Sequence, residues 1–464
     1  MGYKLMHLHL HGLIRSRDLE LGRDADTGGQ TLYVLELVKE LAACNAVDNV
    51  QLVTRLIQDR RVSSDYASEK EVIVPGAEII RVPFGPKRYL RKELLWPFLN
   101  ALADKLIAQL NNEPTLPDWI HAHYADAGYV GALISKALGI PLVFTGHSLG
   151  REKNRRLLEA GMDHNQIENT YSITRRIEAE EMALSNSSLI ITSTSQEAKN
   201  QYARYANFVS SKAHVMPPGV DLKRFNLAQN QNDISYIDQL MEPFLRKPEL
   251  SPLLAISRAV RRKNIPALVE AFGRSKILRE RHNLVLVLGT RTDSRQLDKH
   301  QREVFQQIFE LVDRYELYGQ VAYPKKHKRD QIPSFYQWAS ERKGLFVNPS
   351  LTEPFGLTLL EAAACGLPMV ATNDGGPVEI LARCGNGLLV DVTDLNSLQT
   401  TLEKAGSNDY LWNRWKDNGV EGVNNYFSWS AHVAKYIALM KDYLNNHSTQ
   451  RLQNMIHLSR IKVS

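Results

Sequence analysis

Cysteine is scarce in this chain, and long apolar runs are missing. The 464 residues include three cysteines, Cys44, Cys365 and Cys384, which are too few for a disulfide framework or a zinc cluster. No run approaches the length of about 18 apolar residues that a membrane-spanning helix needs. The first residues also lack the profile of a signal peptide. We therefore expect a cytoplasmic protein that does not enter a membrane.

Signatures of bound cofactors are missing as well. The sequence has no G-x-G-x-x-G motif, and the similar Gly385-Asn386-Gly387 leads into a predicted strand. That context is wrong for a dinucleotide pyrophosphate, which needs a helix to follow the glycines. His121 and His123 have the spacing of a metal-binding pair, but the sequence offers no evident third ligand. We expect neither a cofactor nor a bound metal.

The composition is that of a folded protein with a modest positive charge. With 43% hydrophobic residues, 23% charged residues and a mean hydropathy of −0.31, the chain can bury a core. Its net charge of +6 favours anionic partners. The densest basic clusters, residues 258–263 and 325–329, each follow a predicted strand. This placement suits a pocket for a small phosphate compound better than a nucleic-acid groove, and a solvated basic face is the alternative.

Apolar runs alternate with amphipathic stretches from end to end, which indicates an α/β fold with parallel sheets. We predict thirteen strands, too many for one open sheet of ordinary size, and so two doubly wound domains. The first strand is expected at residues 4–9, and one long helix at 92–110. Pro217-Pro218-Gly219 interrupts the pattern. We therefore place the domains at residues 1–218 and 219–428, with the segment 429–464, helical over 429–444, packing back on the first domain.

A glycine loop follows the first predicted strand. Asp24-Ala25-Asp26-Thr27-Gly28-Gly29-Gln30 opens the first strong helical pattern. Glycines at a helix start allow backbone N–H groups to approach an anion closely. The position, at the carboxyl end of a strand, is where doubly wound folds bind ligands. A tight strand-to-helix turn is the alternative explanation.

Cations and carboxylates are concentrated in the second half. Arg258 ends a predicted strand and Lys263 opens the next helix, so the two could clamp a diphosphate. Pro354 and Gly356 suit a strained loop from which a helix begins, and the N-terminus of that helix would be a second anion site. Glu361 is eight residues after Glu353, about two helical turns along the same face, so both carboxylates could face a ligand. Carboxylates in that arrangement suit sugar hydroxyls, and their origin in one element does not suit a glycosidase pair.

His147 ends another predicted strand and has glycines close on both sides. A lone histidine is usually a structural group. The position at a strand end makes a ligand-binding role an equal alternative.

Together these motifs resemble those of retaining glycosyltransferases of the GT-B type and, more narrowly, the sucrose-phosphate synthase family. The donor and phosphate motifs are shared with sucrose synthase, so they indicate the class and not the acceptor. The narrower resemblance covers about Leu5 to Trp429. It rests on Asp26–Gln30, Leu52–Arg55, Lys92–Pro97, His123–Gly128, Thr145–Lys153, Arg175–Glu181, Val321–Lys325 and Asn348–Pro377.

The resemblance implies two Rossmann-like domains that face a central cleft, with the acceptor in the first and the nucleotide sugar in the second. Glucose would pass from UDP-glucose or ADP-glucose to fructose 6-phosphate with retention, giving sucrose 6-phosphate. The implied catalytic residues are His147, Arg258, Lys263 and Glu353. The implied donor-binding residues are Gly29, Arg258, Lys263, Phe355, Gly356, Leu357, Thr358 and Glu361. The implied acceptor-binding residues are Gly29, Gln30, Lys92, Tyr124, Ser148, Lys153 and Arg176.

Two departures and two alternatives accompany this resemblance. Ala259-Val260 stand where the family usually has an acidic residue, which bears on donor selectivity. No phosphatase signature occurs, so the product would stay phosphorylated, and association with a separate phosphatase is expected. Sucrose synthase, acting on free fructose, is the alternative enzyme. A nucleic-acid or regulatory binding protein is the more distant one, and it lacks the interleaved aromatic residues that would support it.

Overall fold

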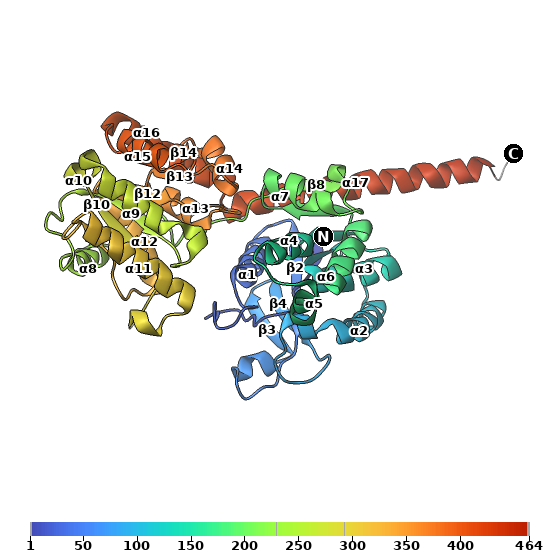
Figure 1. Cartoon of the computed structure of the whole chain (residues 1–464). Coiled ribbons are helices and arrows are strands. Elements are labelled where there is room, and N and C mark those ends of the chain that lie inside the picture. The colour runs from blue at the N-terminus through green and yellow to red at the C-terminus, as the bar shows by residue number, and fades with distance from the viewer. Residues whose placement is uncertain (1, 229, 292, 462–464) are drawn as a thin grey trace. The chain divides into compact units, whose positions relative to one another are not determined.

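The computed structural model describes residues 2–228, 230–291 and 293–461. The chain divides into two compact units. Unit 1 contains residues 1–218 and 432–464, and unit 2 contains residues 219–431. Each unit is a sheet with helices on both faces (Figure 1). The predicted α/β class is confirmed.

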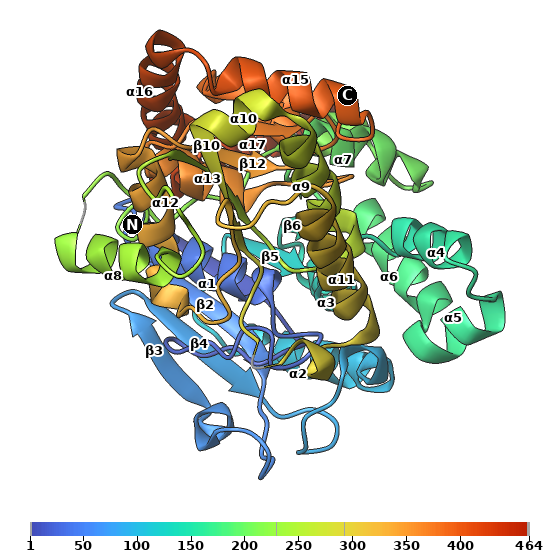
Figure 2. The same ribbon diagram turned by 60° about the vertical axis from the view of Figure 1, so that its left-hand side comes forward.

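Unit 1 is built on an eight-stranded sheet in the order β3-β4-β2-β1-β5-β6-β7-β8. Only β3 runs antiparallel to its neighbour, β4. The β3, β4, β2 edge of the sheet is visible side by side in Figure 2. In chain order the strands are β1 Tyr3–Leu8, β2 Val47–Arg55, β3 Lys70–Val74, β4 Ala77–Val82, β5 Trp119–His123, β6 Leu142–Thr145, β7 Leu189–Thr192 and β8 Ala213–Val215. The helices are α1 Gly29–Ala42, α2 Leu99–Asn111, α3 Ala125–Leu138, α4 Gly150–Glu159, α5 His164–Tyr171, α6 Ile173–Asn186, α7 Ser195–Asn200 and α17 Trp429–Ile461.

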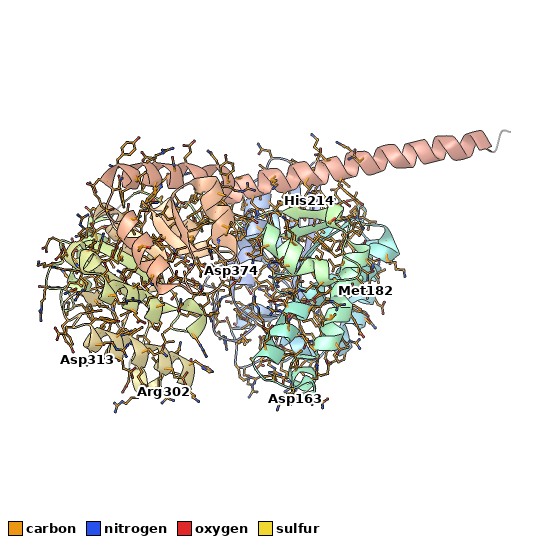
Figure 3. All side chains as sticks on the ribbon, turned by 45° about the horizontal axis from the view of Figure 1, so that its top comes forward. Asp163, Met182, His214, Arg302, Asp313 and Asp374 are labelled. Carbon is orange, nitrogen blue, oxygen red and sulfur yellow. The ribbon has the colours of Figure 1, made fainter. Side chains whose placement is uncertain are left out.

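Unit 2 has a six-stranded, wholly parallel sheet in the order β11-β10-β9-β12-β13-β14. In chain order the strands are β9 Ser251–Ile256, β10 His282–Val287, β11 Val321–Ala322, β12 Leu345–Asn348, β13 Met369–Thr372 and β14 Gly387–Val390. The helices are α8 Gln231–Met241, α9 Ile265–Arg274, α10 Lys276–Arg281, α11 Lys299–Arg314, α12 Ile332–Glu341, α13 Leu357–Ala364, α14 Gly376–Cys384, α15 Leu395–Ala405 and α16 Asp409–Tyr426. Figure 3 labels Arg302 and Asp313 on α11.

The central strands are buried because helices cover both faces of each sheet. Every residue of β5, β6, β7, β12 and β13 is buried, as expected for parallel strands. Strand order reverses between β1 and β5 in unit 1, and between β9 and β12 in unit 2. Ligands of doubly wound folds bind outside the carboxyl ends of the strands at such a reversal.

Three expectations about elements were wrong. Strand β3 was not predicted, because Lys70 and Glu71 give this edge strand a charged start, which protects sheet edges from pairing. Residues 92–98 form two short 3-10 turns, and α2 begins only at Leu99. Pro97 cannot donate a helical hydrogen bond, which explains the late start. Helix α17 continues to Ile461 and does not end near Leu444.

Helix α17 packs on unit 1 although it follows unit 2 in the chain. The indole Nε1 of Trp119, in β5, donates to the Tyr436 hydroxyl at 2.8 Å. Lys435 donates to the carbonyl of Val215, at the end of β8. Figure 1 shows α17 beside β8 and α7, and Figure 3 labels His214 on β8. Among the helices that the structure describes, none combines the length and apolar character that a membrane span requires.

The Trp119–Tyr436 bond should contribute measurably to the stability of unit 1. Tyr436→Phe leaves the buried indole N–H of Trp119 unpaired, which costs about 1–3 kcal/mol. We expect amide hydrogen exchange in β5 to accelerate by the corresponding factor. Tyr410→Phe is the matched control, since Tyr410 is 75% exposed. Equal exchange rates in the two variants would show that the hydroxyl does not hold α17 in place.

Candidate active site

The glycine loop of unit 1 lies at the strand-order reversal, as its sequence position suggests. Gly28 is the N-cap of α1, and nothing lies within 4 Å of a Cβ placed on Gly28 or Gly29. Backbone N–H groups at the start of α1 are thus accessible to an anion. Gln30 turns inward: its amide nitrogen lies 3.1 Å from Nδ1 of His9 and 3.5 Å from the carbonyl oxygen of His123.

Two residues beside this loop hold unusual backbone conformations. Tyr124, which follows β5, has φ 80° and ψ 172°, a region occupied almost only by glycine. His147, which follows β6, has φ 55°, in the left-handed region. Non-glycine residues persist in such conformations when the surrounding structure enforces them, and they cluster at ligand sites. The resemblance assigns Tyr124 to acceptor binding and His147 to the catalytic residues.

Three cationic side chains of unit 1 influence one another electrostatically. Burial, together with the charges of Arg176 and Lys92, lowers the pKa of Lys153 to about 8. Arg176 pairs with Glu180 at 3.0 Å, and Lys92 pairs with Asp26. Lys153 instead lies 3.6 Å from the centre of the Tyr171 ring. Within the described ranges, no carboxylate forms an ion pair with Lys153, so this cluster has room for an anion's charge.

Arg176 organises the surroundings of that cluster. Its guanidinium donates to the Ser148 carbonyl at 2.6 Å and to the Ser148 hydroxyl at 3.0 Å. It also lies 4.5 Å from the centre of the Tyr124 ring. Glu180 accepts the Gly150 N–H at the start of α4. Five of the predicted acceptor residues therefore lie in one connected group: Lys92, Tyr124, Ser148, Lys153 and Arg176.

A polar layer of histidines underlies this region. His7 and His123 are hydrogen bonded at 3.1 Å, and His123 and His147 at 3.0 Å. With His121, the residues His7 and His123 place their ligand atoms within 4.8 Å of one another. His7 is therefore the third histidine that the sequence did not reveal. The alternating His7-x-His9-x-His11 pattern on β1 was the available signal, since alternate strand residues share a face.

In unit 2 a small cavity lies at the carboxyl ends of β9 and β12. The nine residues that line it are Ala255, Ile256, Ser257, Lys263, Ile265, Val347, Asn348, Pro349 and Ser350. Lys263 belongs to a 3-10 turn that ends at Asn264, whose φ is 53°. Arg258 follows the lining residue Ser257 and is exposed. The two predicted diphosphate cations thus flank the strand-order reversal.

Lys263 and Glu353 form a salt bridge that is shielded from solvent. The same carboxylate oxygen of Glu353 accepts from the Asn348 amide at 3.2 Å and lies 3.5 Å from the Ser350 hydroxyl. Glu353 is 9% exposed, so this network holds both charges in place at the cavity edge.

The loop carrying Glu353 packs against a pair of glycines at the start of α14. The Gly376 N–H donates to the Glu353 carbonyl at 2.8 Å, and the Glu353 N–H donates to the carbonyl of Asp374, which Figure 3 labels. A Cβ on Gly375 would lie 2.1 Å from the Glu353 carbonyl oxygen. Glycine is therefore required here by the close approach of two backbones.

The structure has the predicted loop at Pro354 and Gly356 ahead of a helix, but the argument that helical spacing places Glu353 and Glu361 on one face was wrong. Helix α13 begins at Leu357, after Gly356 with φ 97°, so Glu353 precedes the helix. Glu361 lies within α13, where its carboxylate accepts from the Tyr336 hydroxyl at 3.2 Å. Phe355, Gly356, Leu357 and Thr358 form the loop and first turn between the two carboxylates. Their roles in donor binding stay predictions.

Family comparisons identify the class of protein that this fold and these clusters define. The family described as "Sucrose synthase first GT-B domain" matches residues 1–235, and "Glycosyl transferases group 1" matches residues 238–421. The chain belongs to the GT-B glycosyltransferases.

Within that class, the chain is similar to sucrose-phosphate synthases. It is 39% identical to a sucrose-phosphate synthase of Zea mays over 93% of this chain and 46% of the relative. It is 38% identical to sucrose-phosphate synthase 4 of Arabidopsis thaliana over 97% of this chain and 48% of the relative. The chain thus spans about half the length of these relatives. The resemblance found in the motifs is confirmed.

A solved structure shows the same similarity. The sucrose-phosphate synthase of Thermosynechococcus elongatus superposes with a TM-score of 0.68 at 25% identity, covering 96% of this chain and all of that one. The predicted GT-B fold is confirmed.

Removal of Lys92 should raise the pKa of Lys153. Lys92→Met deletes a repelling charge and frees the carboxylate of Asp26, and both changes favour the protonated lysine. We expect the pKa to rise from about 8 toward the ordinary lysine value of 10.5. The measurement is an NMR titration of the Lys153 side chain, assigned with Lys153→Arg. Lys105→Met, on α2, should leave it unchanged, and a fall in Lys92→Met would contradict the cluster.

Proposed function

We propose that this chain transfers glucose from a nucleotide-glucose to fructose 6-phosphate with retention, giving sucrose 6-phosphate. The observation that carries the acceptor assignment is the cluster of Lys92, Lys153 and Arg176, in which Lys153 is only partly buried and is destabilised as a cation. A phosphate dianion would stabilise these three cations through charge-assisted hydrogen bonds. The sucrose-phosphate synthase relatives support the same acceptor.

The donor would be held by unit 2. Lys263 and Arg258 would bind the diphosphate, Glu353 the glucose hydroxyls and Glu361 the ribose, with the N–H groups of the turn into α13 assisting. As the glycosidic bond breaks, negative charge grows on the diphosphate and fixed cations stabilise it. Following the family resemblance, we assign no protein nucleophile: the acceptor attacks from the same face, and the departing phosphate takes its proton. His147, with Gly29 and Gln30, would lie against the transferred sugar.

Sucrose synthase is a second candidate, because the family that matches residues 1–235 carries that name. A crossed assay separates the two. UDP-glucose and ADP-glucose are each combined with fructose and with fructose 6-phosphate, and the products are identified by NMR, including the anomeric configuration. Preference for free fructose would favour sucrose synthase. Binding of a separate phosphatase to the chain stays a prediction.

Loss of Lys153 should affect the phosphorylated acceptor alone. A charge-assisted hydrogen bond is worth about 1.5–3 kcal/mol, so Lys153→Ala should raise the KM for fructose 6-phosphate at least about tenfold. Turnover of free fructose should hardly change. Arg175→Ala, the exposed neighbour of Arg176, is the matched control. Equal slowing of both acceptors would remove Lys153 from the phosphate site.

The same lysine predicts a pH dependence. Its pKa is lowered to about 8, so the cation that binds phosphate is present below that pH and is lost as the pH rises through it. We expect the KM for fructose 6-phosphate to rise above about pH 8 in the wild type. Lys153→Arg stays charged there and should flatten the profile. A profile that is identical in the two proteins would contradict the assignment.

Donor variants should separate binding from chemistry. A ribose contact is nearly the same in the ground and transition states, so Glu361→Ala should raise the donor KM about tenfold with little change in kcat. Diphosphate charge develops during the reaction, so Lys263→Ala should lower kcat about 10²–10³-fold. Lys276→Ala, an exposed change in the same unit, is the control. The reverse pattern would exchange the two roles.

A further inference from the structure

Histidines of two neighbouring strands, and one that follows a third strand, lie together in unit 1. His7 of β1 is in register with His121 of β5, and His123 of β5 is in register with Thr145, two residues before His147. Alternate residues of a strand point to the same side, so these imidazoles form one polar layer. Tyr33 of α1 packs its ring against His123 and His147.

Three of these rings are joined end to end. Nδ1 of His7 lies 3.1 Å from Nε2 of His123, and Nδ1 of His123 lies 3.0 Å from Nε2 of His147. The ring centres are 5.4 Å and 5.2 Å apart, so each pair of nitrogens lies nearly on the line between its two ring centres. This is the geometry of two linear hydrogen bonds in sequence.

All three rings are neutral. Burial lowers the pKa of His7 and of His147 to about 3, and burial together with the neighbouring histidines holds that of His123 well below its ordinary value. A neutral imidazole has one N–H donor and one acceptor nitrogen. The two hydrogen bonds therefore must run in the same direction along the chain of rings.

The direction of the two hydrogen bonds is determined at His7, the ring at the opposite end of this series from His147. Nε2 of His7 is buried and has no hydrogen-bond partner among residues 2–228, 230–291 and 293–461. If the bonds ran from His147 toward His7, this atom would carry a buried N–H with no acceptor, and such donors are rarer than unfilled acceptors. If they run from His7 toward His147, the unpartnered atom is only a lone pair.

We propose that His7 and His123 are positioning residues that hold His147 in the tautomer with its proton on Nδ1. In this arrangement Nδ1–H of His7 donates to His123, Nδ1–H of His123 donates to Nε2 of His147, and His147 presents an N–H donor on its remaining nitrogen. The tautomer follows from the rings alone. Its use toward a hydroxyl of the donor sugar rests on the proposed function.

A metal ion is the competing occupant of this layer, since His121 brings a third imidazole near His7 and His123. Zinc would need its nitrogens to converge on one point at about 2.0–2.1 Å each. Nδ1 of His7 and Nε2 of His123 instead point at each other along the line between their ring centres, and a metal ion on that line would be closer to both nitrogens than zinc allows. The hydrogen-bonded chain is therefore the better account of the geometry.

The test is the nitrogen NMR spectrum of the imidazoles in the ligand-free protein, labelled in its histidine rings. We expect a protonated Nδ1 and an unprotonated Nε2 for His147. His7→Leu removes the donor and should let both His147 tautomers appear. His7→Asn should restore the wild-type spectrum, because its amide N–H can take the place of Nδ1–H. His121→Asn changes a residue on the same buried face that is not one of the three hydrogen-bonded rings, and it should leave the His147 tautomer unchanged.

Three outcomes would overturn the proposal: a protonated Nε2 on His147 in the wild type, a His7→Leu spectrum unchanged at His147, or stoichiometric zinc on this cluster. Thermal unfolding of each variant checks that the fold is retained, and His7→Asn keeps the test open if His7→Leu does not fold.

Kinetics supply a second readout. Loss of one donor to a neutral hydroxyl should lower kcat/KM for the nucleotide sugar about two- to tenfold in His7→Leu, with recovery in His7→Asn. Equal values in these two variants would overturn the role in donor binding. A wild type without glucosyltransferase activity would refute the proposed function and leave the tautomer assignment standing.

Discussion

The reversal of strand order is the constraint on which both candidate clusters depend. Parallel strands on the two sides of a reversal send their following loops in opposite directions, which leaves room between them for a ligand. In unit 1 the reversal lies between β1 and β5, which places Gln30 and Tyr124 at one edge of the sheet. In unit 2 it lies between β9 and β12, which brings Lys263 to Glu353 across 90 residues of sequence.

The two clusters manage charge in different ways. In unit 2 the lysine is already neutralised by a carboxylate, within a network that includes Asn348 and Ser350. A diphosphate would have to compete for that lysine, so the pair orients the cation in the absence of a ligand. In unit 1 the charge of Lys153 is left without a carboxylate partner within the described residues, and its pKa is lowered by burial and, to a smaller extent, by repulsion from Arg176 and Lys92. A bound phosphate would offset the unfavourable free energy of the Lys153 cation in this site.

Much of this could be predicted from the sequence because its signals are local. Apolar runs gave thirteen of the described strands, and glycine, proline and charge patterns gave the loops at the reversals. The acceptor cluster came from family motifs and not from spacing, because Lys92, Lys153 and Arg176 are far apart in the chain. The edge strand β3 was not predicted, because its charged residues lack the apolar pattern of a buried strand. The spacing argument failed for Glu353 because it carried the helical period back through Pro354 and Gly356, where the sequence itself predicts a loop ahead of the helix.

The role of His7 beside His123 was not predicted for a related reason. A histidine within an apolar strand is most simply explained as an isolated core residue, and its partner His123 is 116 positions away. Only the register between β1 and β5 reveals that the two alternating patterns face the same side. Polar layers of this kind are therefore visible in sequence as alternation, but their hydrogen bonds are not.

Unit 2 is an insertion within unit 1. The chain leaves unit 1 after Pro218 and returns at His432, and the two crossings are tied together where the Val220 N–H donates to the Phe427 carbonyl at 2.8 Å. During synthesis, more than 300 residues are added after Trp119 before Tyr436, the acceptor of its indole hydrogen bond, is made. Unit 1 therefore cannot complete its fold cotranslationally ahead of unit 2, unlike an N-terminal domain of the ordinary kind. No single cut can separate the two as intact bodies. Unit 2 is one continuous segment and can be produced alone, whereas unit 1 can be produced alone only if the chain is joined across the insertion.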